Sequence, residues 1–140
     1  MNTFTIFENN RLTQLYVEPE AYEGVKRIGA RVARDIGLVT GVEPAVMTAP
    51  GQCRNDRIVI FATLGKSPLL EALEASGRWS GAQIRGKREV YQMQVVSAPF
   101  SELHKGGAAP VQEALAIAGS DKRATIYGMF HLSRLCGVSS

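Results

Sequence analysis

Residues 114–137, ALAIAGSDKRATIYGMFHLSRLCG, contain a short apolar run, a charged turn and an amphipathic segment. The run Ala114–Ala118 is too short for an independent helix, and a Gly-Ser pair interrupts it, which indicates a buried strand. Ser120 is the predicted N-cap of the helix that follows, and Asp121 lies in the first turn, where a negative charge is favoured. Apolar residues then recur at helical spacing as far as Gly137. The stretch therefore predicts a strand, a turn and a helix in direct succession.

The same order occurs earlier in the chain. Arg57–Leu64, RIVIFATL, is apolar without alternation, which is typical of a central strand covered on both faces. The segment Gly65–Pro68 then turns the chain, and its proline suits the first position of a helix that reaches about Ser76. Parallel pairing of the two strands would bring both turns to one edge of the sheet. Ligands of open α/β sheets bind at that edge.

The remaining elements are predicted from periodicity and from glycine and proline positions. The longest helix is expected over 21–39, where apolar residues follow three-and-four spacing and Gly41 ends the pattern. Residues 89–96 alternate apolar and polar side chains, which indicates a strand with one wet face or an edge position. Further short strands are expected at 4–7 and 14–17, around a polar turn at 8–11, and at 45–48. Irregular segments are expected at 49–56, 78–88 and 98–112.

Composition limits the class of protein. The chain has 140 residues, of which 45% are hydrophobic and 21% charged, as in an ordinary single globular domain. Its formal charge of +3 comes from basic residues that are spread along the chain, so we expect no nucleic-acid partner. No apolar run approaches the roughly 20 residues of a membrane span, and the beginning, MNTFTIFENNRL, lacks the pattern of a signal peptide. We therefore expect no membrane partner.

The sequence contains no complete active site. Gly65-Lys66-Ser67 is similar to the end of a phosphate-binding loop, but Ile60 stands where that motif requires glycine. A Gly-x-Ser-x-Gly motif is absent, and the two cysteines, Cys53 and Cys136, lack CxxC spacing. We therefore predict no catalytic residue, no metal site and no cofactor.

The two turns carry the candidate site residues. If both turns lie at one sheet edge, their polar side chains form a compact cluster. Each side chain alone also fits a helix cap or a solvated charge, but cations at a helix start oppose the helix dipole, which favours a role for the group. The candidates for substrate binding or interdomain contact are Lys66, Ser67, Ser120, Asp121, Lys122 and Arg123.

Four segments resemble a known family. They are VIFATLGKSPLLEAL at 59–73, GKREVYQMQVV at 86–96, ALAIAGSDKRATIYGMFHLSRLCGVS at 114–139 and YVEPEAYEGVKRIGARVARDI at 16–36. In order and spacing they resemble the N-terminal domain of glycoside hydrolase family 115, the xylan α-glucuronidases. The segment from Tyr127-Gly128 to Leu135 is also similar to accessory domains that precede the barrels of β-hexosaminidases and other α-glucuronidases. One departure is Ala124, where the family usually has glycine after Lys-Arg.

The resemblance implies an α+β fold, with a mixed β-sheet whose helices pack chiefly on one face. It implies that residues 1–140 form a single N-terminal accessory domain, which precedes a (β/α)₈ catalytic barrel that this chain lacks. Family members remove glucuronic acid or its 4-O-methyl ether from xylan with inversion, and their acid and base belong to the barrel. The expected partners are that barrel and glucuronoxylan or its oligosaccharides, and the expected parent enzyme is secreted or periplasmic.

Two functions follow as hypotheses. In the first, the domain is non-catalytic and its two turns face the barrel, where Lys66, Lys122 or Arg123 pairs with a uronate carboxylate or a barrel acid. In the second, the chain is a stand-alone carbohydrate-binding module. Such modules use exposed aromatic side chains, for which only Trp79, Tyr22 and the other tyrosines are available. An independent hydrolase has no residues in its support.

Overall fold

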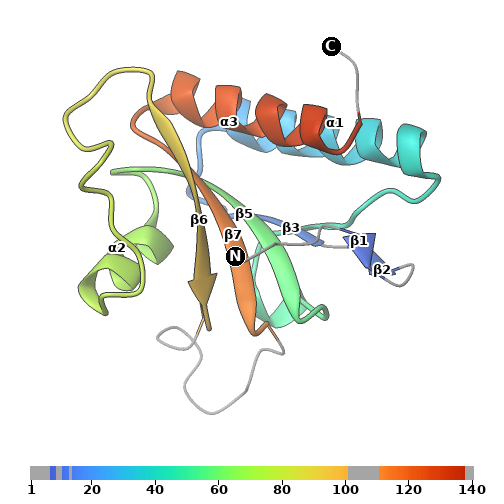
Figure 1. Ribbon diagram of the computed structural model, residues 1–140, viewed down its shortest axis with the longest axis horizontal. Coiled ribbons are helices and arrows are strands. Elements are labelled where there is room, and N and C mark those ends of the chain that lie inside the picture. Colours follow the sequence, from blue (N-terminus) through green and yellow to red (C-terminus); the bar gives the residue numbers. More distant parts are fainter. Residues whose placement is uncertain (1–6, 9–10, 13, 101–110, 138–140) are drawn as a thin grey trace.

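The computed structural model describes residues 7–8, 11–12, 14–100 and 111–137 (Figure 1). These residues form short strands and three α-helices arranged around one main sheet. The elements are β1 (Phe7–Glu8), β2 (Arg11–Leu12), β3 (Gln14–Val17), α1 (Glu23–Thr40), β4 (Val46–Met47), the 3₁₀-helix η1 (Pro50–Gln52), β5 (Arg57–Thr63), α2 (Pro68–Ala75), β6 (Tyr91–Ser97), β7 (Glu113–Gly119) and α3 (Lys122–Leu135).

The main sheet is mixed, with strand order β4-β3-β5-β7-β6. Strands β4, β3, β5 and β7 are parallel, and β6 joins β7 in the antiparallel direction. The central position of β5 and the edge position of β6 confirm the predictions from their apolar patterns. A separate two-stranded ribbon is formed by β1 and β2.

Helices cover both faces of the sheet unequally. The long helices α1 and α3 lie side by side on one face, and the short helix α2 covers part of the other (Figure 1). Successive β5 side chains alternate between these layers: Val59 and Phe61 join the core under α1 and α3, whereas Ile60 joins the core with α2. This double cover explains why β5 is continuously apolar. The predicted α+β fold, with helices chiefly on one face, is confirmed.

Most element boundaries lie within two residues of the prediction. Helix α1 ends at Gly41, whose φ of 89° is the left-handed conformation that glycine tolerates. At the N-terminus, residues 4–6 of a predicted strand lie outside the described residues. Residues 8–11, predicted as a turn, instead include parts of β1 and β2. Of the predicted loop 98–112, residues 101–110 also lie outside the described part.

Candidate functional site

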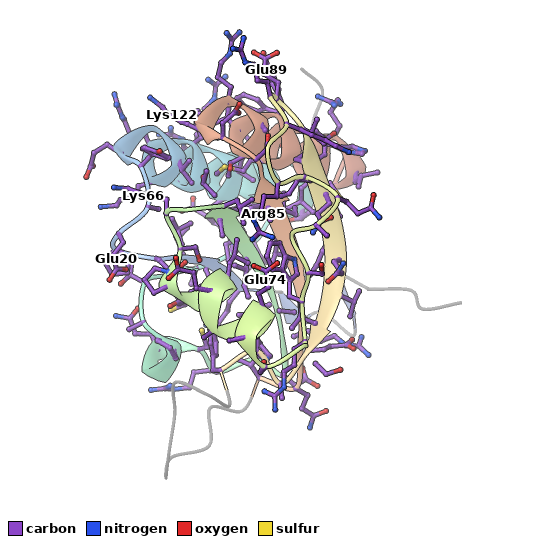
Figure 2. All side chains as sticks on the ribbon, turned by 90° about the vertical axis from the view of Figure 1, so that its left-hand side faces the viewer. Glu20, Lys66, Glu74, Arg85, Glu89 and Lys122 are labelled. Carbon is purple, nitrogen blue, oxygen red and sulfur yellow. The ribbon has the colours of Figure 1, made fainter. Side chains whose placement is uncertain are left out.

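Strands β3, β5 and β7 end at the same edge of the sheet. Val17 of β3 pairs with Phe61 of β5, and Thr63 at the end of β5 pairs with Gly119 at the end of β7. The turns that lead into α1, α2 and α3 therefore meet there, as predicted for the last two. Figure 2 views this edge, with Lys66 and Lys122 on the same side. We refer to this region as the carboxyl edge.

Close packing fixes the start of α3 on the carboxyl edge. A Cβ atom on Gly119 would lie 2.2 Å from the backbone nitrogen of Thr125, so only glycine fits there. The Thr125 hydroxyl donates to Ala62 O at 3.1 Å and lies 2.7 Å from the Thr63 hydroxyl. The first turn of α3 is thus joined directly to the end of β5.

Ser120 and Asp121 have structural roles in the turn before α3. The N-cap is Asp121 and not Ser120, so the predicted cap is wrong by one residue: Asp121 Oδ1 accepts from Ala124 N at 2.9 Å. Asp121 Oδ2 accepts from Glu89 N at 2.9 Å, and these two bonds lower the pKa of Asp121. Ser120 Oγ instead accepts from Val90 N at 3.1 Å. Both side chains hold the entry of β6 against the start of α3.

Arg123 is already paired on the surface. Its Nη1 lies 3.4 Å from Glu89 Oε1, and its Nη2 donates to the Tyr127 hydroxyl at 3.1 Å. The Tyr127 hydrogen bond, followed by the Glu89 charge, raises the pKa of Arg123. Glu89 lies at the upper end of Figure 2, away from Lys66. Arg123 therefore belongs to a surface cluster separate from the β5–α2 turn.

Ser67 is buried and caps α2. Its hydroxyl accepts from Leu70 N at 3.0 Å and donates to Glu18 Oε1. Glu18 Oε2 accepts from Leu69 N at 3.0 Å, although Glu18 belongs to the segment after β3. Glu18 is only 5% exposed, and burial raises its pKa against the opposing effect of these hydrogen bonds. Ser67 is therefore a structural residue, and Glu18 is a second cap that sequence reasoning missed.

Lys66 and Lys122, the lysine pair, both reach the first turn of α1. Lys66 Nζ lies 5.2 Å from the centre of the Tyr22 ring, within cation–π range. Lys122 Cε lies 3.0 Å from where a Cβ atom on Gly24 would be. Both side chains are exposed, and neither forms an ion pair with a residue that the structure describes. The Tyr22 N-cap of α1 makes no side-chain cap hydrogen bond.

This arrangement favours an anion. The ammonium group of Lys66 lies near the Tyr22 ring and the side chain of Lys122 lies near Gly24, at a helix start whose backbone N–H groups carry the positive end of the dipole and whose first turn also contains Glu23. The six predicted residues are therefore divided by the structure. Lys66 and Lys122 are exposed and form no ion pair with a described residue, whereas Ser67, Ser120 and Asp121 hold the turns and Arg123 pairs with Glu89. The sequence signal for the missed cap of α2 was an acidic residue, Glu18, directly after a buried strand.

Other features of the described residues bear on function. They contain no group of three or more His, Cys, Asp or Glu side chains that could hold a metal ion. No helix within them is long and apolar enough to cross a bilayer. Cys53 and Cys136 are free thiols. Trp79, one of the aromatic residues available to a carbohydrate-binding module, is 2% exposed and packs in the core beside α2, so it cannot serve as an exposed platform.

Comparison with known proteins gives a likeness of fold. No family model matches the chain, and no curated protein matches it in sequence. Among solved structures, a family GH115 4-O-methyl-α-glucuronidase with specificity for decorated arabinogalactans is similar over 91% of this chain, with a TM-score of 0.60 and 22% identity. The likeness is to part of a longer enzyme. This chain spans 14% of the length of that one.

Proposed function

We propose that this chain is the non-catalytic N-terminal domain of a glycoside hydrolase that removes glucuronic acid or its 4-O-methyl ether from xylan. In this proposal the domain packs on the catalytic barrel of the enzyme. The observation that supports it is the likeness of 91% of the chain to a 14% portion of an α-glucuronidase. A second observation is that both oxygens of Glu18, the buried carboxylate at the carboxyl edge, are held by Ser67 and Leu69. In this proposal Glu18 caps α2 and is not used as an acid or base.

The lysine pair supports a role for the domain in the pocket that binds the sugar. A uronate carboxylate is an anion that accepts charge-assisted hydrogen bonds from ammonium groups. Lys66 lies over the Tyr22 ring, and a pyranose ring can also pack on an exposed aromatic face. In our proposal the carboxyl edge faces the barrel, and the lysine pair forms one wall of the pocket.

The polymer that carries the uronic acid is a separate question. The family resemblance points to glucuronoxylan, whereas the structural neighbour has specificity for decorated arabinogalactans. The recognised group is the same uronate in both cases. Release of 4-O-methylglucuronate from each polymer, measured side by side on the natural polypeptide that contains this chain, separates the two substrates.

Variants of that natural polypeptide test the role of the lysine pair. Lys66→Ala and Lys122→Ala should each raise KM about tenfold or more, since loss of a charge-assisted hydrogen bond has that effect. Arg134→Ala is the matched control, because it removes a cation in the last turn of α3, the helix that begins at Lys122. It should leave KM unchanged. Unchanged kinetics in both lysine variants would remove the pocket role. Absence of glucuronidase activity in the wild-type polypeptide would overturn the proposed function itself.

A stand-alone carbohydrate-binding module is the alternative function. Trp79 is buried and cannot serve as a platform, whereas the described tyrosines Tyr22 and Tyr127 are 38% and 42% exposed. The alternative requires binding by this chain alone. Calorimetric titration with aldouronic acids decides it: saturable heat that Tyr22→Ala abolishes favours a module, and a flat titration at millimolar ligand excludes it.

A further inference from the structure

Strand β6 forms one edge of the main sheet. Its only hydrogen-bonded neighbour among the described strands is β7, so no described strand pairs with its outer side. Its seven residues, YQMQVVS, include no charge and no proline, and they pair with β7 without a bulge. Natural edge strands usually carry a lysine, a proline or a bulge that prevents pairing with another chain. Strand β6 lacks each of these protections.

The backbone limits this open edge to the seven residues of β6. Glu89, with φ of 55°, precedes the strand, and Ala98, with φ of 45°, follows it. These left-handed conformations are unusual for residues other than glycine, and they mark the two ends of the strand. Gln94 is therefore the central residue of the open edge.

The direction of the backbone groups follows from the pairing with β7. Val90 O accepts from Ser120 N at 2.7 Å, and Ala98 N donates to Gln112 O at 2.8 Å, so even-numbered residues face β7. In an antiparallel ladder the intervening residues direct their N–H and C=O groups to the opposite side. The outward groups of β6 belong to Tyr91, Met93, Val95 and Ser97.

We propose that β6 pairs with β6 of a second copy of this chain, antiparallel, about a two-fold axis that passes through Gln94. In this register Tyr91 lies opposite Ser97 of the other copy, and Met93 lies opposite Val95. Every outward N–H then meets an outward C=O. If one β6 strand is shifted by two residues along the other, fewer residues are paired. If it is shifted by one residue, the outward N–H and C=O groups of one strand lie opposite residues whose groups face β7. The edge is thus self-complementary, as a two-fold interface requires.

The side chains fit the same axis. Gln94 meets its symmetry mate in a pair without mutual backbone hydrogen bonds, where Cα atoms are about 4.5 Å apart. An amide has both donor and acceptor, so the two Gln94 side chains can bond to each other. On the opposite face Met93 packs with the core under α3 and would meet Val95 of the second copy. No like charges are brought together.

Helix α3 adds apolar surface above this edge. Tyr127, His131 and Leu135 are spaced four residues apart and so lie on one stripe of the helix. The stripe lies over β6, because His131 Nδ1 is 2.9 Å from the Tyr91 hydroxyl. Tyr127 is 42% exposed and Leu135 63% exposed, although both are large apolar side chains. With the axis perpendicular to the sheet, the stripes of the two copies face each other.

Introduction of a charge at Gln94 tests the pairing by sedimentation velocity. The wild-type chain should dimerise with increasing concentration. Gln94→Glu and Gln94→Lys should each raise the dimer dissociation constant more than about tenfold, because like charges then meet at the axis. An equimolar mixture of the two variants should form a heterodimer, since opposite charges attract across the strands. Gln83→Glu is the matched control, because it adds the same charge on the exposed 76–90 connection and should leave dimerisation unchanged.

Three results would overturn the proposal. They are a wild-type chain that is monomeric at millimolar concentration, a dimer that neither Gln94 variant weakens, and a mixture of folded monomeric variants that fails to associate. Far-UV circular dichroism establishes that the variants are folded. If they are not, Val95→Pro removes one outward N–H without touching the β7 ladder, and it should abolish dimerisation.

Discussion

Glu18 and Leu69 are joined by a buried hydrogen bond of 3.0 Å between a carboxylate after β3 and the backbone N–H of the first turn of α2. The same carboxylate accepts from the Ser67 hydroxyl. This contact ties the segment after β3 to the turn that carries Lys66. It therefore connects the stability of the domain with the geometry of its candidate site.

Removal of the Glu18 carboxylate should destabilise the domain. Glu18→Ala leaves Leu69 N–H and the Ser67 hydroxyl without their acceptor in a buried place, which costs about 1–3 kcal/mol of unfolding free energy. Urea denaturation measures this loss. Glu20→Ala removes an exposed carboxylate nearby and should change the free energy of unfolding by less than about 0.5 kcal/mol. Equal effects of the two substitutions would contradict the capping role.

The pH dependence of stability should have opposite signs for Glu18 and Asp121. Burial raises the pKa of Glu18, so the folded state holds this proton more tightly than the unfolded state. The contribution of Glu18 to the free energy of unfolding is then largest at low pH. It falls as pH rises past about 4.3, the ordinary pKa of glutamate. Hydrogen bonds from Ala124 N and Glu89 N lower the pKa of Asp121, so its contribution is present above about pH 3.9 and is lost on acidification.

Urea titrations between about pH 3 and 7 test these signs. The free energy of wild-type unfolding relative to Glu18→Gln should decrease with rising pH. The free energy of wild-type unfolding relative to Asp121→Asn should instead increase with rising pH. Slopes of the same sign in both comparisons would show that one of the two environments is misassigned.

Substitutions at two glycines should have contrasting effects. Gly119→Ala places a Cβ atom 2.2 Å from the Thr125 backbone nitrogen, and we expect a loss of more than about 3 kcal/mol or failure to fold. In Gly24→Ala the closest contact of the new Cβ atom is the flexible end of Lys122, and Ile126 Cδ1 lies in ordinary contact at 3.8 Å. Alanine is favoured over glycine within a helix by up to about 1 kcal/mol. Thermal unfolding should show a strong decrease in Tm for the first variant and no decrease for the second.

Both thiols should react slowly in the folded protein. Burial raises the pKa of Cys53 and of Cys136 to about 11, so little thiolate is present near pH 8. Alkylation by iodoacetamide should be slow in buffer and fast in denaturant for both cysteines. Mass spectrometry gives the two rates, with free cysteine as the reference. Rapid labelling of Cys53 in buffer would show that its surroundings open easily.

Local pattern accounts for most of the fold. The continuous apolar run of β5 predicts a strand covered on both faces, and the alternation in 89–96 predicts the edge strand β6. Parallel pairing of β5 with β7 then places the two charged turns together, as expected. These features could be predicted because each depends on periodicity within a short window of sequence.

Contacts between distant segments account for what was missed. Ser120 and Asp121 can both cap a helix, and the choice falls on Asp121 because the Ser120 hydroxyl is bonded to Val90 N. The pairing of Arg123 with Glu89 likewise depends on where β6 begins. The assignment of Trp79 to the core depends on α2 and not on its own neighbours in sequence. None of these partners is visible in a local pattern.

The parallel pairing of β5 with β7 also has a kinetic consequence. Thr63 and Thr125, which join the end of β5 to α3, are 62 positions apart, so a long stretch of chain must be ordered before this junction forms. Such non-local pairings slow folding, because the entropy of loop closure is lost before the contacts are gained. During synthesis β5 can pair with β3, but its other side remains without a partner strand until β7 has left the ribosome. The domain therefore completes its centre last, when nearly all of the chain is present.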